Sequence, residues 1–188
     1  PVRVSPFQVA VAGGPRPTST RTKRDLLALS RRCERRAGTG GDDLLVLVTV
    51  QENRFWTART RAVYARIAAR GATVVAFGVG LPTDLRGPGR GGVATVGIAE
   101  DDLLADEWLV VFCSPTERWG FLARDAAAGL PGARSGPRLA PPDDPGTADA
   151  DRRFLWADLD DPVWLERSAA VLLTRVPSLA VRVPWLQR

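Results

Sequence analysis

The sequence predicts a single α/β domain with three layers, built on a mixed or mostly parallel sheet of about five to six strands with helices on both faces. Three apolar runs support this fold class, at residues 44–50, 73–77 and 108–113. Their shortness and their β-branched or aromatic residues are typical of strands that are buried on both faces. Helical patterns lie between strands, as in α/β domains. Two further strands are expected, at residues 93–98 and 153–158.

Turn residues bound each of the three runs, so we expect the strands to share one core. Within the run at 108–113, either the even or the odd positions should pack with Leu45, Leu47, Val75 and Phe77. Alternate side chains of a strand point to opposite faces of the sheet, and only one set can join these four residues.

Three helices are predicted from capping signals and helical periodicity. The first follows Thr22 and Asp25, which fit a reciprocal N-terminal cap. The second follows Thr57 and covers about residues 58–70. The last begins at Pro162, a residue suited to the first turn of a helix, and runs to about residue 176.

A further helix is expected directly after the run at 108–113. Ser114 is a suitable N-cap, Pro115 suits the first helical position, and Glu117 supplies the reciprocal side chain of a capping box. A buried strand that leads into a capped helix is the repeating unit of an α/β domain.

The pattern divides the chain into a central domain at residues 20–176 and two short flanks. Residues 1–19 are expected to be an extension or an edge strand, and residues 177–188 a tail or an edge strand. Residues 129–151 hold five prolines, four glycines and hardly any large apolar side chain. Such a segment cannot bury enough surface to offset its ordering entropy, so we predict a flexible insertion.

Charge is unevenly distributed along the chain. Residues 1–36 hold nine Lys and Arg against two acidic residues, whereas the remainder holds 17 against 19. The basic residues therefore concentrate at the first helix. No apolar stretch approaches the roughly 20 residues of a membrane-spanning helix, and no signal peptide opens the chain, so a cytoplasmic location is expected.

Composition argues against catalytic and metal chemistry. The chain lacks histidine, which removes the commonest general base and the commonest zinc ligand. Cys33 and Cys113 are expected to serve as small apolar residues. The Gly78-Val79-Gly80 sequence lacks the helix that a dinucleotide fingerprint requires. Acidic residues at 100–107 flank a turn, where solvated charges are common. We expect no cofactor, no metal site and no catalytic residue.

A candidate ligand site follows the first buried strand. Gln51, Arg54, Phe55 and Trp56 come directly after it, and Tyr64 lies nearly two turns into the next helix. Open α/β sheets form their binding crevices at the carboxyl ends of strands. The alternative is structural: Phe55 and Trp56 would then fill the core above the helix.

The first helix carries a basic face, on which Arg31, Arg32 and Arg35 are candidate partner-binding residues. This face could instead contact nucleic acid. We favour contact with a protein partner or a neighbouring domain over direct nucleic-acid binding, and a homodimer remains open.

Several stretches together resemble the DICT sensory domain family. They are TKRDLLALSR (residues 22–31), RFW (54–56), AARGA (68–72), LADEWLVV (104–111) and DRRF (151–154). Tyr64 falls between the second and third of these, and the resemblance spans residues 20–176.

The resemblance implies a non-catalytic cytoplasmic sensory module. Such domains are found beside diguanylate cyclases, two-component proteins and MerR-type DNA-binding domains. We therefore expect this chain to bind a small-molecule signal or a protein partner in bacterial signal transduction or transcription regulation. One rival hypothesis is a nucleic-acid-binding protein that uses residues 21–36. The other is a small doubly wound enzyme.

Overall fold

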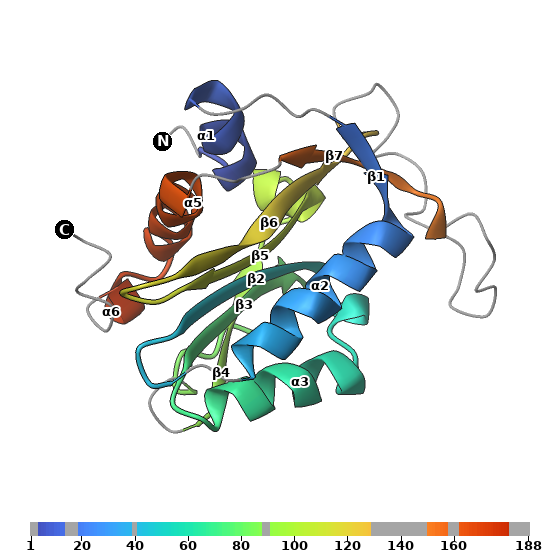
Figure 1. Ribbon diagram of the computed structural model, residues 1–188. Helices are drawn as coiled ribbons and strands as arrows, with labels where there is room; N and C mark the ends of the chain where they lie inside the picture. Colours follow the sequence, from blue (N-terminus) through green and yellow to red (C-terminus); the bar gives the residue numbers. More distant parts are fainter. Residues whose placement is uncertain are drawn as a thin grey trace.

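In the computed structural model, the described residues are 4–13, 19–38, 41–87, 91–128, 150–157 and 162–180. They form one seven-stranded sheet between two helical layers (Figure 1). The strands are β1 (Ser19–Thr22), β2 (Leu45–Glu52), β3 (Thr73–Val79), β4 (Val93–Ile98), β5 (Glu107–Cys113), β6 (Arg118–Asp125) and β7 (Arg153–Ala157). The α-helices are α1 (Pro6–Gly13), α2 (Lys23–Ala37), α3 (Ala58–Ala68), α5 (Pro162–Leu173) and α6 (Pro177–Ala180). Two 3-10 helices are η1 (Asn53–Phe55) and η2 (Leu103–Asp106).

The strand order is β1-β7-β6-β5-β2-β3-β4. Strands β2, β3 and β4 are parallel to one another, and all other neighbouring pairs are antiparallel. The predicted three-layer α/β class with a mixed sheet is therefore confirmed. Strands β1 and β6 were not predicted as such and bring the sheet to seven strands.

Two apolar cores lie on opposite faces of the sheet. Helices α1 and α5 cover one core, and α2 and α3 cover the other (Figure 1). Strand β2 shows the alternation, because Leu45 and Leu47 belong to the α1/α5 core while Val46 and Val48 belong to the α2/α3 core. In β5 the odd positions pack with Leu45, Leu47, Val75 and Phe77, so the second of the two expected registers is the correct one. Cys33 and Cys113 are buried and free.

The capping signals at Thr22 and Thr57 are confirmed. The Thr22 hydroxyl oxygen accepts a hydrogen bond from the Asp25 amide at 3.2 Å, and the Asp25 carboxylate accepts one from the Thr22 amide at 3.2 Å. The Thr57 hydroxyl oxygen accepts from the amide of Thr60 at 3.2 Å. These caps fix where α2 and α3 begin.

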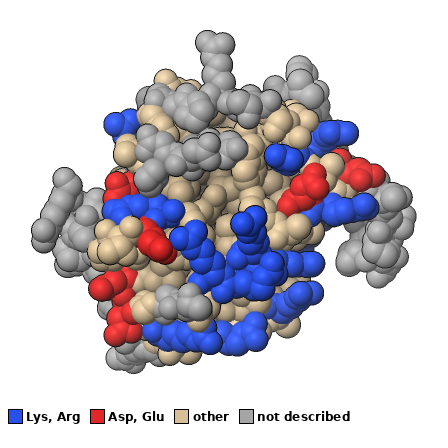
Figure 2. All heavy atoms as spheres, viewed as in Figure 1, with Lys and Arg blue, Asp and Glu red and all other residues tan. Residues whose placement is uncertain are grey.

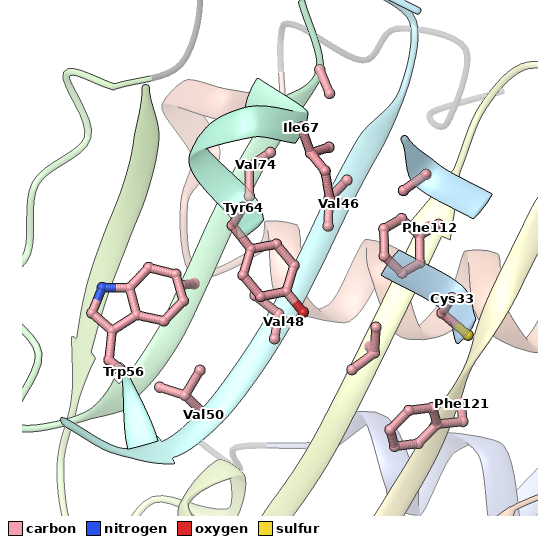
Figure 3. Close-up of a cluster of buried hydrophobic side chains, with 14 of the residues drawn as sticks. Cys33, Val46, Val48, Val50, Trp56, Tyr64, Ile67, Val74, Phe112 and Phe121 are labelled. Carbon is pink, nitrogen blue, oxygen red and sulfur yellow. The ribbon is translucent and has the colours of Figure 1, made fainter. Parts of the chain in front are cut away.

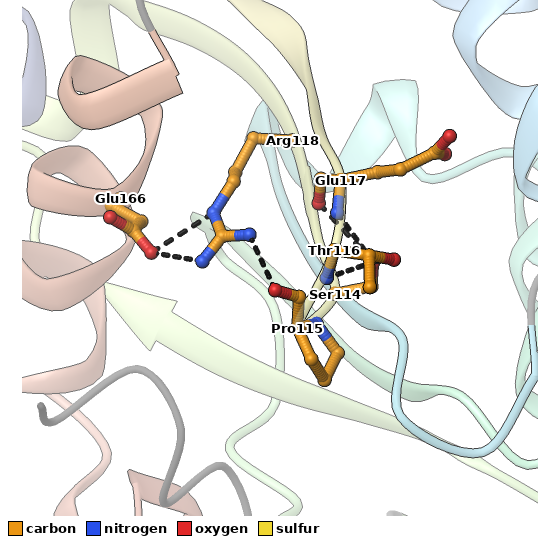
Figure 4. Close-up of polar contacts among 6 residues, drawn as sticks. All are labelled: Ser114, Pro115, Thr116, Glu117, Arg118 and Glu166. Carbon is orange, nitrogen blue, oxygen red and sulfur yellow. Dashed lines mark hydrogen bonds and ion pairs between the residues drawn. The ribbon is translucent and has the colours of Figure 1, made fainter.

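The helix expected after β5 is wrong, because residues 114–117 form a hairpin turn into β6 (Figure 4). The Ser114 hydroxyl does accept a hydrogen bond from the Glu117 amide, at 3.0 Å, as an N-cap would. However, the Ser114 amide donates to the Glu117 carbonyl at 2.8 Å, which closes a turn. Arg118 then pairs with Glu166 of α5 and fixes the start of β6 against that helix.

The segment at residues 6–13 is a helix and not an edge strand. Pro6 occupies its first position, and the Ser5 hydroxyl accepts a hydrogen bond from the Gln8 amide at 3.0 Å, which caps it. Phe7 joins the α1/α5 core. The Glu107 carboxylate accepts a hydrogen bond from the Phe7 amide at 3.2 Å. Burial is the main cause that raises the pKa of Glu107 to about 7.

The predicted insertion at 129–151 lies outside the described residues except for its last two. Its two ends are tied together, because Asp125 and Arg152 form a largely buried ion pair and the Ala126 amide donates to the Arg153 carbonyl at 3.0 Å. Residues 181–188 also lie outside the described part. Among the helices described, none has the length and apolar character needed to cross a lipid bilayer.

Candidate ligand-binding cleft

The end of β2 departs from regular strand geometry. Its pairing with β5 stops at Val48, and its register with β3 shifts between Thr49 and Glu52. Within this bulge Gln51 adopts a φ of 57°, which is uncommon for a residue with a side chain. Bulges of this kind are concentrated beside functional sites, and left-handed non-glycine residues cost on the order of 1–3 kcal/mol.

Thr49 holds β2 against β5 where the ladder ends. Its hydroxyl donates to the Glu107 carbonyl at 2.7 Å and accepts from the Leu109 amide at 2.9 Å. One side chain therefore replaces the backbone pairing that the bulge removes. This leaves the last residues of β2 free to turn away from β5.

A cleft of about 360 Å³ lies over this end of β2, between α2 and α3. Its apolar and aromatic lining comes from Leu27, Val48, Val50, Phe55, Val63 and Trp108. Its polar lining includes Lys23, Ser30, Arg31, Glu34, Gln51 and Arg59. A cleft with mostly apolar walls and a few polar groups is the usual form of a small-molecule site.

Gln51 is one of the buried polar residues that line this cleft. The residue is only 6% exposed. Its side-chain nitrogen is buried and has no hydrogen-bond partner within the described part of the chain. Leaving a buried donor unsatisfied costs about 1–3 kcal/mol, so this amide favours a partner that enters the cleft.

Tyr64 forms the inner wall and is fully packed (Figure 3). Its hydroxyl donates to the Glu34 carboxylate at 3.3 Å, and the Ser30 hydroxyl donates to the same oxygen at 2.9 Å. Burial, followed by the Glu34 charge, raises the pKa of Tyr64 well above its ordinary value. The phenol therefore stays neutral and acts as a fixed hydrogen-bond donor that joins α3 to α2.

Comparison with known proteins identifies the family. A family model described as the sensory domain in diguanylate cyclases and two-component systems, abbreviated DICT, matches residues 6–125. The chain belongs to the DICT family. No curated protein and no solved structure matched the chain. The matched region of this DICT domain contains every residue that lines the cleft.

The structure brings three of the five predicted ligand-binding residues together in the cleft: Gln51, Phe55 and Tyr64. Arg54 does not line it. The Arg54 guanidinium pairs with Glu52 at 3.0 Å and lies 4.8 Å from the centroid of the Phe55 ring. It supports Phe55 from outside the cleft.

Trp56 also lies outside the cleft. It is 9% exposed, belongs to the α2/α3 core and stacks on Tyr64 with ring centroids 5.8 Å apart (Figure 3). Trp56 therefore fills the core, as the structural alternative expected, whereas Phe55 lines the cleft.

The three predicted partner-binding arginines of α2 face different surroundings in the DICT domain. Arg31 lines the cleft, and Arg31 and Arg35 both line an adjoining groove between α2 and α3. Arg32 lies on the other side of α2, in a hollow that Trp119 also lines. They do not form one common face.

Sequence reasoning missed the α2 side of the cleft. Lys23, Leu27, Ser30, Arg31 and Glu34 repeat with helical spacing and therefore lie along one stripe of α2. This stripe mixes polar and apolar residues, so its periodicity alone did not distinguish it from a solvated face. Only the packing of α2 beside α3 shows that it lines a site.

Proposed function

We propose that this DICT domain is a non-catalytic cytoplasmic sensory module that binds a small-molecule signal in the cleft between α2 and α3. The observation that carries this proposal is Gln51, whose buried side-chain nitrogen has no hydrogen-bond partner among the described residues and whose left-handed backbone stands beside a largely apolar cleft. A strained backbone and an unsatisfied donor together indicate a position kept for binding and not for stability.

A ligand in this cleft would contact three separate elements. Gln51 belongs to β2, Ser30 and Glu34 to α2, and Thr60 to α3. A ligand that favours one spacing of the two helices shifts the population toward that spacing. The outer residues of α2, including Arg32 and Arg35, are exposed and available to report the change to a signalling or transcription-control partner.

Binding is favoured over catalysis by the state of the polar groups. Tyr64 stays neutral because its pKa is raised, and Glu34 accepts hydrogen bonds from both Tyr64 and Ser30. The Tyr64 phenol is therefore not poised to exchange protons with a substrate near neutral pH. The arrangement suits recognition by shape and hydrogen bonding.

Thermal melting tests the proposal. The low-molecular-mass fraction of an extract from the protein's own host cells should raise the melting temperature of the wild-type protein. A ligand at about 100 times its Kd stabilises a protein by about 2.7 kcal/mol. Gln51→Leu should abolish this rise because it removes the unpaired amide donor.

Asn53→Leu is the matched control, because Asn53 is an exposed amide that does not line the cleft. It should retain the full rise. Equal responses in the wild type and in Gln51→Leu, or no response in any of the three proteins, would reject ligand binding at this cleft.

A further inference from the structure

A second hollow continues the cleft along α2 and α3. It has a volume of about 330 Å³ and shares Arg31, Glu34, Arg59 and Val63 with the cleft. We call this second hollow the arginine groove, because five arginines line it: Arg31, Arg35, Arg59, Arg66 and Arg70. Figure 2 shows Lys and Arg side chains gathered over α2 and α3.

The charges of the arginine groove are not balanced by carboxylates. Glu34 is the one acidic residue among the groove's lining. Within the described residues, none of the five arginines forms an ion pair. By contrast, Arg118, Arg152 and Arg175 elsewhere in the domain all pair with a carboxylate. A recess lined by one sign of charge concentrates the field and attracts counter-ions.

The rest of the cleft is mostly apolar and aromatic. Phe55, Tyr64 and Trp108 present aromatic surface, and Val48 and Val50 supply its apolar floor. Lys23 lies 4.5 Å from the centroid of the Phe55 ring and borders the same space. A planar ring system can be buried here and stack on these side chains, with Gln51 as its hydrogen-bond donor.

We propose that the signal is a small organic phosphate whose planar ring enters the cleft and whose phosphate groups lie in the arginine groove. This inference rests on the proposed function and adds the chemical class of the ligand. The planar guanidinium fork matches phosphate oxygens in pairs. Arg31 and Arg59 line both spaces and stand where the ring and the phosphate groups would join.

The shape of the site favours a small ligand over a nucleic acid. Two of the arginines, Arg31 and Arg59, lie in a recess between two helices that continues into a space lined by buried residues such as Gln51 and Tyr64. All five arginines of the groove are exposed, so a duplex backbone is the competing occupant of their surface. Duplex DNA is therefore included in the test as a competitor.

A fluorescence titration tests the inference with three probes. The first is 8-anilinonaphthalene-1-sulfonate, an anionic naphthalene dye whose emission rises in apolar surroundings. The second is N-phenyl-1-naphthylamine, which has similar rings but no charge. The third is inorganic pyrophosphate, used as a competitor. Both dyes should bind the wild type, and pyrophosphate should displace only the anionic dye.

The decisive variant is the double substitution Arg31→Gln and Arg59→Gln. It should weaken the anionic dye and pyrophosphate at least about tenfold, as expected when two charge-assisted contacts are lost, and leave the neutral dye unchanged. The matched control is Arg24→Gln with Arg61→Gln. These are exposed arginines of the same two helices that line neither hollow. The control should behave as the wild type.

Several outcomes would overturn the inference. Pyrophosphate that fails to displace the anionic dye, or that displaces it equally from the decisive and control variants, would show that the arginine groove does not select phosphate. If the neutral dye still bound in that case, ligand binding in the cleft would stand and only the phosphate assignment would fall. Displacement by duplex DNA at concentrations far below pyrophosphate would favour a nucleic-acid partner.

Discussion

Gln51 shows what a single residue contributes to this DICT domain. Its position at the end of a buried strand was sufficient to select it as a candidate, and the structure places it with Phe55 and Tyr64 in the lining of one cleft. Its left-handed backbone could not be predicted, because it depends on the register shift between β2 and β3. Nor could the lack of a partner for its side-chain nitrogen among the described residues, which depends on tertiary packing. Arg54 and Trp56 follow the same strand just as closely, yet their side chains lie outside the cleft.

Glu107 provides a prediction about pH at the residue scale. Burial raises its pKa to about 7 from an ordinary 4.5. Between these two values the folded state binds more protons than the unfolded state, so stability should fall as pH rises. The loss should be on the order of 3 kcal/mol between pH 4.5 and 7, at 1.36 kcal/mol per pKa unit.

Urea unfolding at several pH values measures this loss. Glu107→Gln cannot ionise and should flatten the slope over that range, whereas substitution of the exposed Glu100 by Gln should retain it. The assignment would be disproved if the free energies of unfolding of the wild type and of Glu107→Gln changed equally between pH 4.5 and 7.

At the scale of elements, capping residues and apolar runs predicted most of the helices and strands that they bound or form. The caps at Thr22 and Thr57 and the apolar runs of β2, β3 and β5 all gave the correct element. Two Ser-Pro sequences show the limit. Ser5 and Ser114 each accept a hydrogen bond from the amide three residues ahead at 3.0 Å.

The first of these serines begins α1, and the second closes the turn between β5 and β6. The bond that marks a capping box therefore also stabilises a β-turn, and the following residues decide between the two. Trp119 and Phe121 lie opposite Phe112 and Val110 of β5. A helix in their place would prevent this pairing. Pairing with a distant strand cannot be read from a capping signal.

The residues on either side of the insertion are held together, so the insertion should be replaceable without loss of the fold. Asp125 and Arg152 hold the end of β6 beside the start of β7. Replacing residues 129–149 with a short Gly/Ser connector should therefore change the free energy of unfolding by less than about 1 kcal/mol, because loop-closure entropy depends weakly on length. Urea denaturation measures this change. Loss of the folded state would show that the segment contributes to the core.

At the scale of the whole molecule, the cleft joins parts that lie far apart in the chain. Residues 23–34 form one wall, residues 55–64 the other, and Trp108 closes the end. Strand β2 lies beneath them and is the strand at which the sheet changes from parallel to antiparallel pairing. The sequence predicted only the wall that follows β2. The other wall, on α2, depends on how that helix packs across the sheet, which no local pattern shows.

Native mass spectrometry of protein purified from its own host tests this site most directly. Val63 lines the cleft between α2 and α3, while its neighbour Ala62 is exposed and does not. Val63→Trp should fill the cleft, and Ala62→Trp should leave it open. Ligand binding in the cleft predicts a bound small molecule on the wild type and on Ala62→Trp, and none on Val63→Trp. The same adduct on a folded Val63→Trp protein, or no adduct on any of the three, would contradict it.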